Sequence, residues 1–187
     1  MIATVGACDF EPRSRGTHFE ALARSIISQQ LSTKAAATIH GRFQALFPRK
    51  APRADTLLRL DDETLRSVGL SRQKIGYLRD LAVRANSDEI PLASLGRLSN
   101  EAIIEELTKV KGIGTWTVQM FLMFRLGRLD VLPILDLGIQ NGVQRAYGMK
   151  KRPLPKHIEK IGAKWAPYRT LASWYLWRSL DVAGGVP

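Results

Sequence analysis

A turn with two glycines, Gly112 and Gly114, joins two amphipathic segments of the chain. Its apolar-x-Gly-x-Gly pattern runs directly into a helix that Thr115 is expected to open, and no β-strand pattern precedes it. A dinucleotide-binding Gly-x-Gly needs a strand before the turn, so the pattern favours two helices joined by a hairpin. The backbone N–H groups at such a helix start suit a phosphate, because they lack helical partners and the helix dipole adds positive charge. An ordinary helix C-cap glycine between packed helices is the alternative.

Apolar residues at helical spacing recur along most of the chain, and no convincing run alternates with period two, which predicts an all-α fold. Thr17 and Glu20 form a capping box ahead of a helix with five apolar positions. Serine N-caps predict further helix starts at Ser32, Ser71 and Ser99. Helices are also expected over 55–60, 62–68, 155–165 and 167–180.

The overall charge favours a polyanionic partner. Lys and Arg number 28 against 17 Asp and Glu, which leaves a net charge of +11, and neutralised phosphates release counterions. A generic basic surface is the alternative. The single cysteine, Cys8, excludes a disulfide framework, a four-cysteine iron–sulfur cluster and a Cys-rich zinc site. No apolar run suits a membrane span and no signal-peptide pattern is present, so we expect an intracellular protein without membrane contact.

Asp136 is the candidate for acid–base or electrostatic chemistry, at the N-cap or first turn of a helix that Gly148 ends. A structural N-cap is the commonest use of Asp at such a place and stays open. Apolar neighbours disfavour a charged carboxylate and mark it as functional if it faces a cleft. These neighbours are Ile134, Leu135 and Leu137. Asp130 is the second candidate, but we expect it to pair with an arginine of the 125–128 segment.

Polar and aromatic side chains supply two further hypotheses. Gln29 and Gln30 end an otherwise apolar helix, where such side chains either fill the gap left by an extruded base or simply face water. The four tryptophans are core residues by default, while one or two of them would line a pocket that stacks an electron-poor base. These tryptophans are Trp116, Trp165, Trp174 and Trp177.

Five separated stretches together resemble the helix-hairpin-helix (HhH-GPD) DNA glycosylases, and among them the bacterial 3-methyladenine DNA glycosylase II, or AlkA-like, group. The stretches are residues 25–36 (SIISQQLSTKAA), 65–81 (LRSVGLSRQKIGYLRDL), 107–121 (LTKVKGIGTWTVQMF), 130–143 (DVLPILDLGIQNGV) and 165–172 (WAPYRTLA). The resemblance implies a single domain over 1–187 with helical lobes of about 32–135 and 1–31 plus 136–187, and without the N-terminal β domain of some relatives.

The resemblance also implies residue roles. Asp136 matches the essential aspartate, Trp116 and Trp177 match base-pocket aromatics, and Gln29, Gln30 and Leu31 match the wedge that enters the duplex. The hairpin that grips the DNA backbone corresponds to Val110, Lys111, Gly112, Ile113, Gly114 and Thr115. Backbone carbonyls of Thr108, Val110 and Ile113 fall where relatives hold a structural Na⁺ or K⁺. No cofactor is otherwise expected.

Strand-cleaving relatives place a nucleophilic lysine where this chain has Trp116. We therefore expect a monomeric, monofunctional DNA glycosylase that flips alkylated purines of the 3-methyladenine and 7-methylguanine type out of double-stranded DNA. Hydrolysis of the N-glycosidic bond would leave an abasic site for base excision repair. A bacterial host would place it in the cytoplasm, at the nucleoid. The alternatives are a bifunctional glycosylase/lyase for oxidised bases and a non-catalytic helix-hairpin-helix DNA-binding module.

Overall fold

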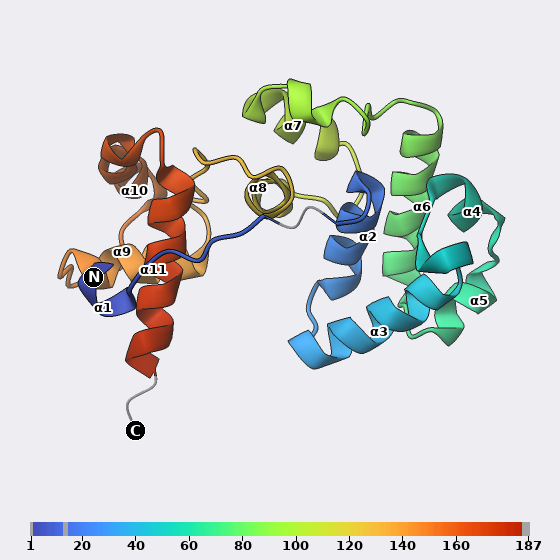
Figure 1. The fold of residues 1–187 in the computed structure, drawn as a ribbon, viewed down its shortest axis with the longest axis horizontal. Helices are drawn as coiled ribbons and strands as arrows, with labels where there is room; N and C mark the ends of the chain where they lie inside the picture. The colour runs from blue at the N-terminus through green and yellow to red at the C-terminus, as the bar shows by residue number, and fades with distance from the viewer. Residues whose placement is uncertain (1, 13–14, 185–187) are drawn as a thin grey trace. The chain divides into compact units, whose positions relative to one another are not determined.

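The computed structural model describes residues 2–12 and 15–184, and every regular element in these residues is a helix (Figure 1). This confirms the predicted all-α class. Among the described residues, no helix is both long and apolar enough to cross a membrane. The α-helices are α1 (Ile2–Val5), α2 (His18–Ser28), α3 (Thr33–Ala45), α4 (Ala54–Arg59), α5 (Asp62–Ser67), α6 (Arg72–Asn86), α7 (Asn100–Leu107), α8 (Thr115–Phe124), α9 (Leu137–Ala146), α10 (Pro155–Gly162) and α11 (Arg169–Gly184). The 3₁₀ helices are η1 (Pro48–Lys50), η2 (Leu95–Arg97) and η3 (Ala163–Trp165).

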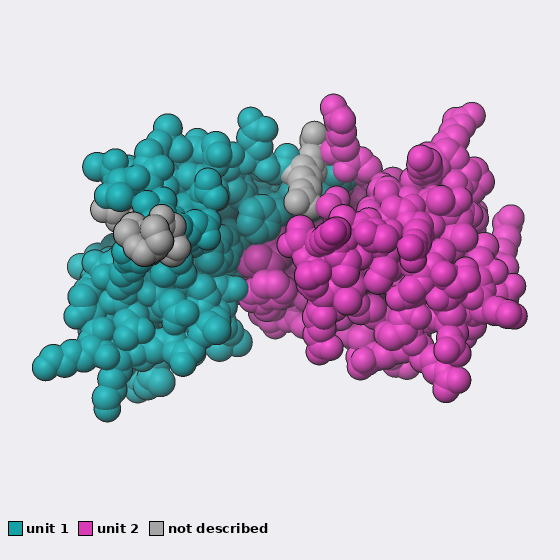
Figure 2. Space-filling view, turned by 90° about the horizontal axis from the view of Figure 1, so that it is seen from below, with its two compact units in different colours: residues 1–13, 122–187 teal, residues 14–121 magenta. Residues whose placement is uncertain are grey.

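The chain forms two compact units, coloured separately in Figure 2. Unit 1 comprises residues 1–13 and 122–187, and unit 2 comprises residues 14–121. The divisions differ from the expected lobe limits at 31 and 135. Helix α2 belongs to unit 2 because it packs against α3 and α6, and the second division falls inside α8. The N-terminal segment joins unit 1 because α1 packs against α11.

Local side-chain chemistry sets the helix starts of unit 2. The hydroxyl of Thr17 accepts the Glu20 N–H at 3.1 Å, as the capping box predicts. Ser32, Ser71 and Ser99 each accept the N–H of the residue three positions on, at 3.2–3.3 Å, which confirms these predicted N-caps. The apolar stripe of α2 is buried against α3 and α6, and each of its side chains larger than alanine contributes about 1.5–3 kcal/mol. This stripe is Phe19, Leu22, Ala23, Ile26 and Ile27.

Unit 1 is organised around the contact of α9 with α11. Gly142 permits this close packing, because a Cβ atom there would lie 2.9 Å from the Cβ of Leu176 and 3.0 Å from its carbonyl oxygen. The core that results consists of Ile139, Val143, Ile158 and Leu176. Helix α11 begins at Arg169, later than the expected start at Pro167, because Pro167 lies in a turn closed by the Tyr168 N–H to Trp165 carbonyl bond of 2.7 Å.

Candidate functional site

Asp136 is the N-cap of α9, one of the two positions that its sequence context predicts. Its Oδ1 atom accepts the backbone N–H of Ile139 at 2.8 Å and the indole Nε1–H of Trp177 at 2.8 Å. The side chain is half-buried, while Leu135 and Leu137 on either side are 66% and 55% exposed. The expected apolar surround is therefore wrong for these two leucines, because their side chains face outward. The structure instead orients the carboxylate with two N–H donors.

Gly138 provides the space in which the Trp177 indole meets Asp136. A Cβ atom on Gly138 would lie 2.7 Å from Cδ1 and 2.8 Å from Nε1 of Trp177, and 3.0 Å from Oδ1 of Asp136. Any larger residue would therefore displace the indole or the carboxylate. The Trp177 ring also stacks on Phe124, with the centroids 6.1 Å apart and the planes at 28°. The indole is thus confined by close contact with a glycine and by stacking on an aromatic ring.

The loop before Asp136 is fixed to α11 by one buried residue, Thr170. Thr170 is fully buried, and its Oγ1 donates to the Arg128 carbonyl at 2.7 Å and accepts the Val131 N–H at 3.1 Å. The Thr170 N–H also donates to the Leu129 carbonyl at 2.8 Å. Three hydrogen bonds therefore connect the first residues of the loop to the helix that carries Trp177.

Asp130 pairs with Arg169, at 2.5 Å from Nε and 2.8 Å from Nη2. The bidentate partner is thus Arg169, which lies outside the 125–128 segment where the partner was expected. The hydrogen bonds from Arg169, together with its charge, hold the pKa of Asp130 below its ordinary value. Asp130 therefore has a structural partner, which leaves Asp136 as the better candidate for chemistry.

In unit 2, the predicted hairpin lies between α7 and α8. Val110 and Ile113 are buried, and the Ile113 N–H donates to the Val110 carbonyl at 3.1 Å. Gly112 has a φ of +80°, and a Cβ atom there would lie 2.2 Å from the Tyr77 ring, so both conformation and packing require glycine. Gly114 differs, since a Cβ atom there would meet nothing within 4 Å. Its exposed surface leaves room for a ligand to approach the backbone at the start of α8.

Three side chains brace this hairpin from within unit 2. The Gln29 Nε2 donates to the Gly112 carbonyl at 2.7 Å, and the Asp80 Oδ2 accepts the Lys111 N–H at 2.9 Å. Lys74 Nζ donates to the carbonyl of Gln29 at 2.8 Å and to that of Ile27 at 2.7 Å, and its burial lowers its pKa. The Lys111 N–H thus serves the fold in this structure, so the predicted phosphate donors must come from residues later in the turn.

The three predicted wedge residues differ in their exposure and in their hydrogen bonds. Gln29 is half-buried and its amide is bonded to the hairpin. Gln30 is exposed and has a φ of 56°, in the left-handed region, and the adjoining Leu31 is 37% exposed. Holding a non-glycine residue in this region costs about 1 kcal/mol or more. Gln30 and Leu31 therefore have the exposure that a wedge requires, whereas Gln29 is a brace.

The four tryptophans also differ in their exposure and in their place in the fold. Trp174 is 9% exposed and Trp165 packs against the core of unit 1, as the default assignment predicts. Trp116, in the first turn of α8, is 48% exposed and lies in unit 2, whereas Trp177 belongs to unit 1. An exposed indole of this size at a helix start offers a face for stacking.

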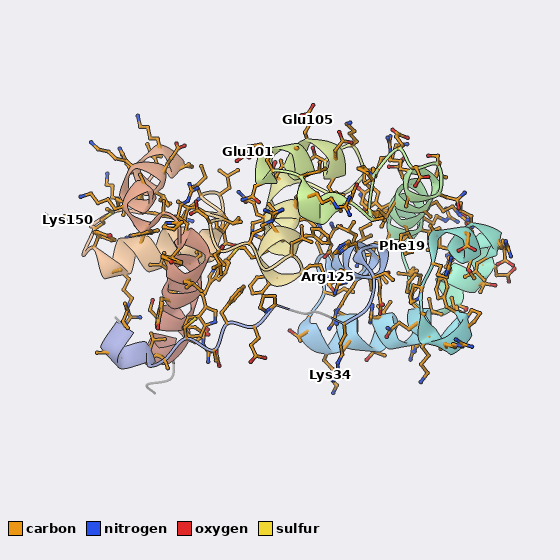
Figure 3. All side chains as sticks on the ribbon, turned by 45° about the horizontal axis from the view of Figure 1, so that its top comes forward. Phe19, Lys34, Glu101, Glu105, Arg125 and Lys150 are labelled. Atoms are coloured by element: carbon orange, nitrogen blue, oxygen red, sulfur yellow. The ribbon has the colours of Figure 1, made fainter. Side chains whose placement is uncertain are left out.

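Exposed basic side chains gather on α10 and on the turn before it, where Figure 3 labels Lys150. Between residues 145 and 164 the chain has seven basic residues and one acidic residue, Glu159. All seven are exposed, and none forms an ion pair within the described residues. They are Arg145, Lys150, Lys151, Arg152, Lys156, Lys160 and Lys164. At the hairpin, by contrast, Lys109 pairs with Glu106 at 2.8 Å, which raises the Lys109 pKa.

Sequence reasoning missed the residues that orient the site. Gly138 and the Trp177 donor had no local signal, because Trp177 lies 41 residues from its acceptor. Lys74 did have one, since a lysine directly before the buried Ile75 and four residues before Leu78 is unusually placed. Among the described residues, no group of three or more His, Cys, Asp or Glu side chains could hold a metal ion.

Comparisons with known proteins place this fold in a family. A model described as "HhH-GPD superfamily base excision DNA repair protein" matches residues 23–168. DNA-3-methyladenine glycosylase 1 of Schizosaccharomyces pombe is 41% identical, covering 88% of this chain and 73% of that protein. The alkylbase DNA glycosidase-like protein mag2 of the same yeast is 33% identical, covering 95% and 85%. The chain therefore belongs to the HhH-GPD superfamily of base excision DNA repair proteins, which confirms the resemblance seen in the sequence.

Solved structures agree with this assignment. The S. pombe 3-methyladenine DNA glycosylase Mag1, in complex with abasic DNA, matches with a TM-score of 0.83 at 37% identity, covering 99% of this chain and 91% of that one. A DNA-3-methyladenine glycosidase from Bacillus halodurans matches with a TM-score of 0.82 at 39% identity, covering 90% and 78%. Both the helical architecture and the order of the elements thus have experimental counterparts.

Proposed function

We propose that this chain is a monofunctional DNA glycosylase that releases alkylated purines from double-stranded DNA. Its relatives at 33–41% identity include proteins named DNA-3-methyladenine glycosylase. The observation that carries the proposal is Asp136, a half-buried carboxylate oriented by two N–H donors in a chain of this superfamily. The product would be an abasic site, and the setting would be base excision repair inside the cell, with the protein acting as a monomer.

Flipping precedes chemistry. Extruding a base costs a few kcal/mol, and less for a damaged pair, so part of the selection occurs before bond cleavage. Gln30 and Leu31, exposed at the end of α2, would occupy the gap left in the duplex. Backbone N–H groups at the start of α8, beside the open Gly114, would bind a phosphate of the same strand.

Bond cleavage then needs one carboxylate. Alkylation at N3 or N7 makes the purine cationic, so the electron pair of the C1′–N9 bond moves to N9 and the base leaves neutral. A second carboxyl group acting as general acid is unnecessary for such a leaving group. The Asp136 carboxylate would stabilise the positive charge that develops on the sugar. Water adds to C1′, and its proton passes to Asp136 or to solvent.

We also propose that the carbonyls of Thr108, Val110 and Ile113 hold a structural Na⁺ or K⁺ at the hairpin. The donor set fits a monovalent cation because backbone carbonyl oxygens are hard ligands. The Val110 carbonyl already accepts the Ile113 N–H, and its second lone pair serves the cation. Such an ion would stiffen the turn and take no part in bond cleavage.

The function is tested by incubating the protein with methylated duplex DNA and identifying the released base by chromatography. We expect free 3-methyladenine or 7-methylguanine, abasic sites that alkali cleaves, and no covalent adduct after borohydride treatment. A borohydride-trapped adduct would instead identify a glycosylase/lyase that uses a Schiff-base lysine. Salt-sensitive DNA binding without release of any base would identify a binding module. The same assay with ethenoadenine and hypoxanthine duplexes defines the lesion range.

A further inference from the structure

An unbroken row of aromatic rings leads from the N-terminal segment to Asp136. Phe10 packs on Phe124, with the ring centroids 5.5 Å apart, and Phe124 stacks on Trp177 at 6.1 Å. The Trp177 Nε1 then donates to the Asp136 carboxylate at 2.8 Å. All four residues belong to unit 1. The row ends at the one oxygen atom of Asp136 that also accepts the Ile139 N–H.

Phe10 is the inward-facing residue of an otherwise exposed segment. Residues 6–9, 11 and 12 are exposed, whereas Phe10 is half-buried. The segment is attached at both ends of this stretch: the Tyr175 hydroxyl donates to the Gly6 carbonyl at 3.2 Å, and Pro12 packs against Gly127. A Cβ atom on Gly127, which has a φ of +68°, would lie 3.0 Å from Pro12. The attachments therefore direct the Phe10 ring onto Phe124.

We propose that the N-terminal segment, residues 2–12, is part of the catalytic machinery, with Phe10 as a positioning residue that acts on Asp136 through Phe124 and Trp177. The inference rests on the proposed role of Asp136. The family match covers residues 23–168 and includes neither Phe10 nor Trp177. Both ends of the chain would thus complete the site around the aspartate.

The physical reason lies in how the indole is confined. At the Cδ1 and Nε1 atoms of the indole Gly138 leaves no room, since even a Cβ atom there would overlap Trp177. The only aromatic ring among the described residues that stacks on the indole is Phe124, and Phe10 packs against that ring. Without Phe10, Phe124 can turn towards the vacated space and the indole can follow. The Nε1–H then points away from the line to Oδ1, and the hydrogen bond that orients the carboxylate is weakened without being fully lost.

The test compares Phe10→Leu with Phe10→Tyr in single-turnover release of 7-methylguanine from methylated duplex DNA. Leu retains an apolar side chain without a ring, and Tyr retains the ring. We expect Phe10→Leu to lower the rate constant by between about two- and tenfold, the equivalent of one lost aromatic pair. Phe10→Tyr should retain the wild-type rate constant. The dissociation constant for DNA should stay unchanged in both, and Val83→Ala, at an exposed position of α6, serves as the unaffected control.

A double-mutant cycle separates positioning from general loosening of the fold. Trp177→Phe keeps a ring but removes the donor, so Phe10→Leu should have no further effect on the rate in that background. Phe124→Leu breaks the same row at its next ring and should behave like Phe10→Leu. A wild-type rate in Phe10→Leu, or equal losses in both backgrounds, overturns the inference. Absence of base release by the wild-type protein would instead overturn the proposed function, so the two failures are distinguishable.

Discussion

Replacing Gly138 with alanine sets two opposing effects against each other at a single atom. In an ordinary helix Gly→Ala stabilises a protein by about 0.5–1 kcal/mol, because the unfolded chain loses freedom. At Gly138 the new Cβ atom would lie 2.7–2.8 Å from the Trp177 ring and 3.0 Å from the Asp136 carboxylate. Relieving such an overlap in packed surroundings costs about 1–3 kcal/mol. The overlap outweighs the gain, so we expect a net loss of up to about 2.5 kcal/mol in the free energy of unfolding.

The effect on base release should be larger than the effect on stability. The overlap displaces the indole, and the Trp177–Asp136 hydrogen bond, to a charged acceptor, breaks. Such bonds contribute about 1.5–3 kcal/mol. If that orientation is needed only when charge develops on the sugar, the single-turnover rate constant falls by about 10- to 150-fold.

Gly41→Ala is the matched control for this prediction. Gly41 lies within α3, and a Cβ atom there would meet nothing within 4 Å. We expect Gly41→Ala to raise the unfolding free energy by about 0.5–1 kcal/mol and to leave the rate constant unchanged. Urea denaturation and single-turnover release of 7-methylguanine measure both quantities for each variant. If Gly138→Ala matched Gly41→Ala in stability and rate, the close approach of Trp177 to Asp136 would have no functional meaning.

Three further outcomes are expected. Changing the exposed lysines Lys156, Lys160 and Lys164 together to Gln should lower the slope of log Kd against log salt by about 0.9 for each phosphate that the protein no longer neutralises, and an unchanged slope would exclude this surface from DNA binding. Gly114→Ala should weaken DNA binding with little loss of thermal stability, whereas Gly112→Ala should lower both because of its positive φ and the Tyr77 ring; equal stability losses would contradict the distinction. Burial, with a smaller contribution from Arg24, lowers the pKa of His40, while Glu20 opposes this shift. As the pH falls, the unfolded chain therefore binds a proton at His40 before the folded protein does. The contribution of neutral His40 to the free energy of unfolding is complete above about pH 6.5 and is lost as the pH falls through the folded-state pKa. Urea denaturation across about pH 5–8, a window set around that ordinary pKa, should show this slope in the wild type and not in His40→Leu.

Local chemistry made the helices predictable. A hydroxyl at Thr17 or Ser71 finds its N–H donor three residues on, so the helix starts can be found from sequence alone. The placement of Asp136 as an N-cap has the same origin. The all-α class was predictable for the same reason, since the helical spacing of apolar residues repeats within each single element.

Contacts between distant residues were not predictable in this way. The Gln29 amide bonds to a carbonyl 83 residues away, which turned an expected wedge residue into a brace of the hairpin. Trp177 reached Asp136 across 41 residues with the polar edge of its ring, an orientation that residue type does not specify. The outward direction of Leu135 and Leu137 likewise depends on how α9 packs, because each leucine is equally compatible with either face. Tertiary packing, which a single sequence does not display, decided all three.

Asp136→Asn isolates the charge of the carboxylate on which the proposed chemistry depends. Asparagine is a good N-cap, so the variant should fold, and its amide oxygen can still accept both N–H donors. We expect loss of 7-methylguanine release under single-turnover conditions, with DNA affinity within a few-fold of wild type. The matched variant Asp130→Asn, which alters the structural pair with Arg169, should retain base release. Release by Asp136→Asn at the wild-type rate would refute the catalytic role of Asp136, because no charge would then be needed at that carboxylate.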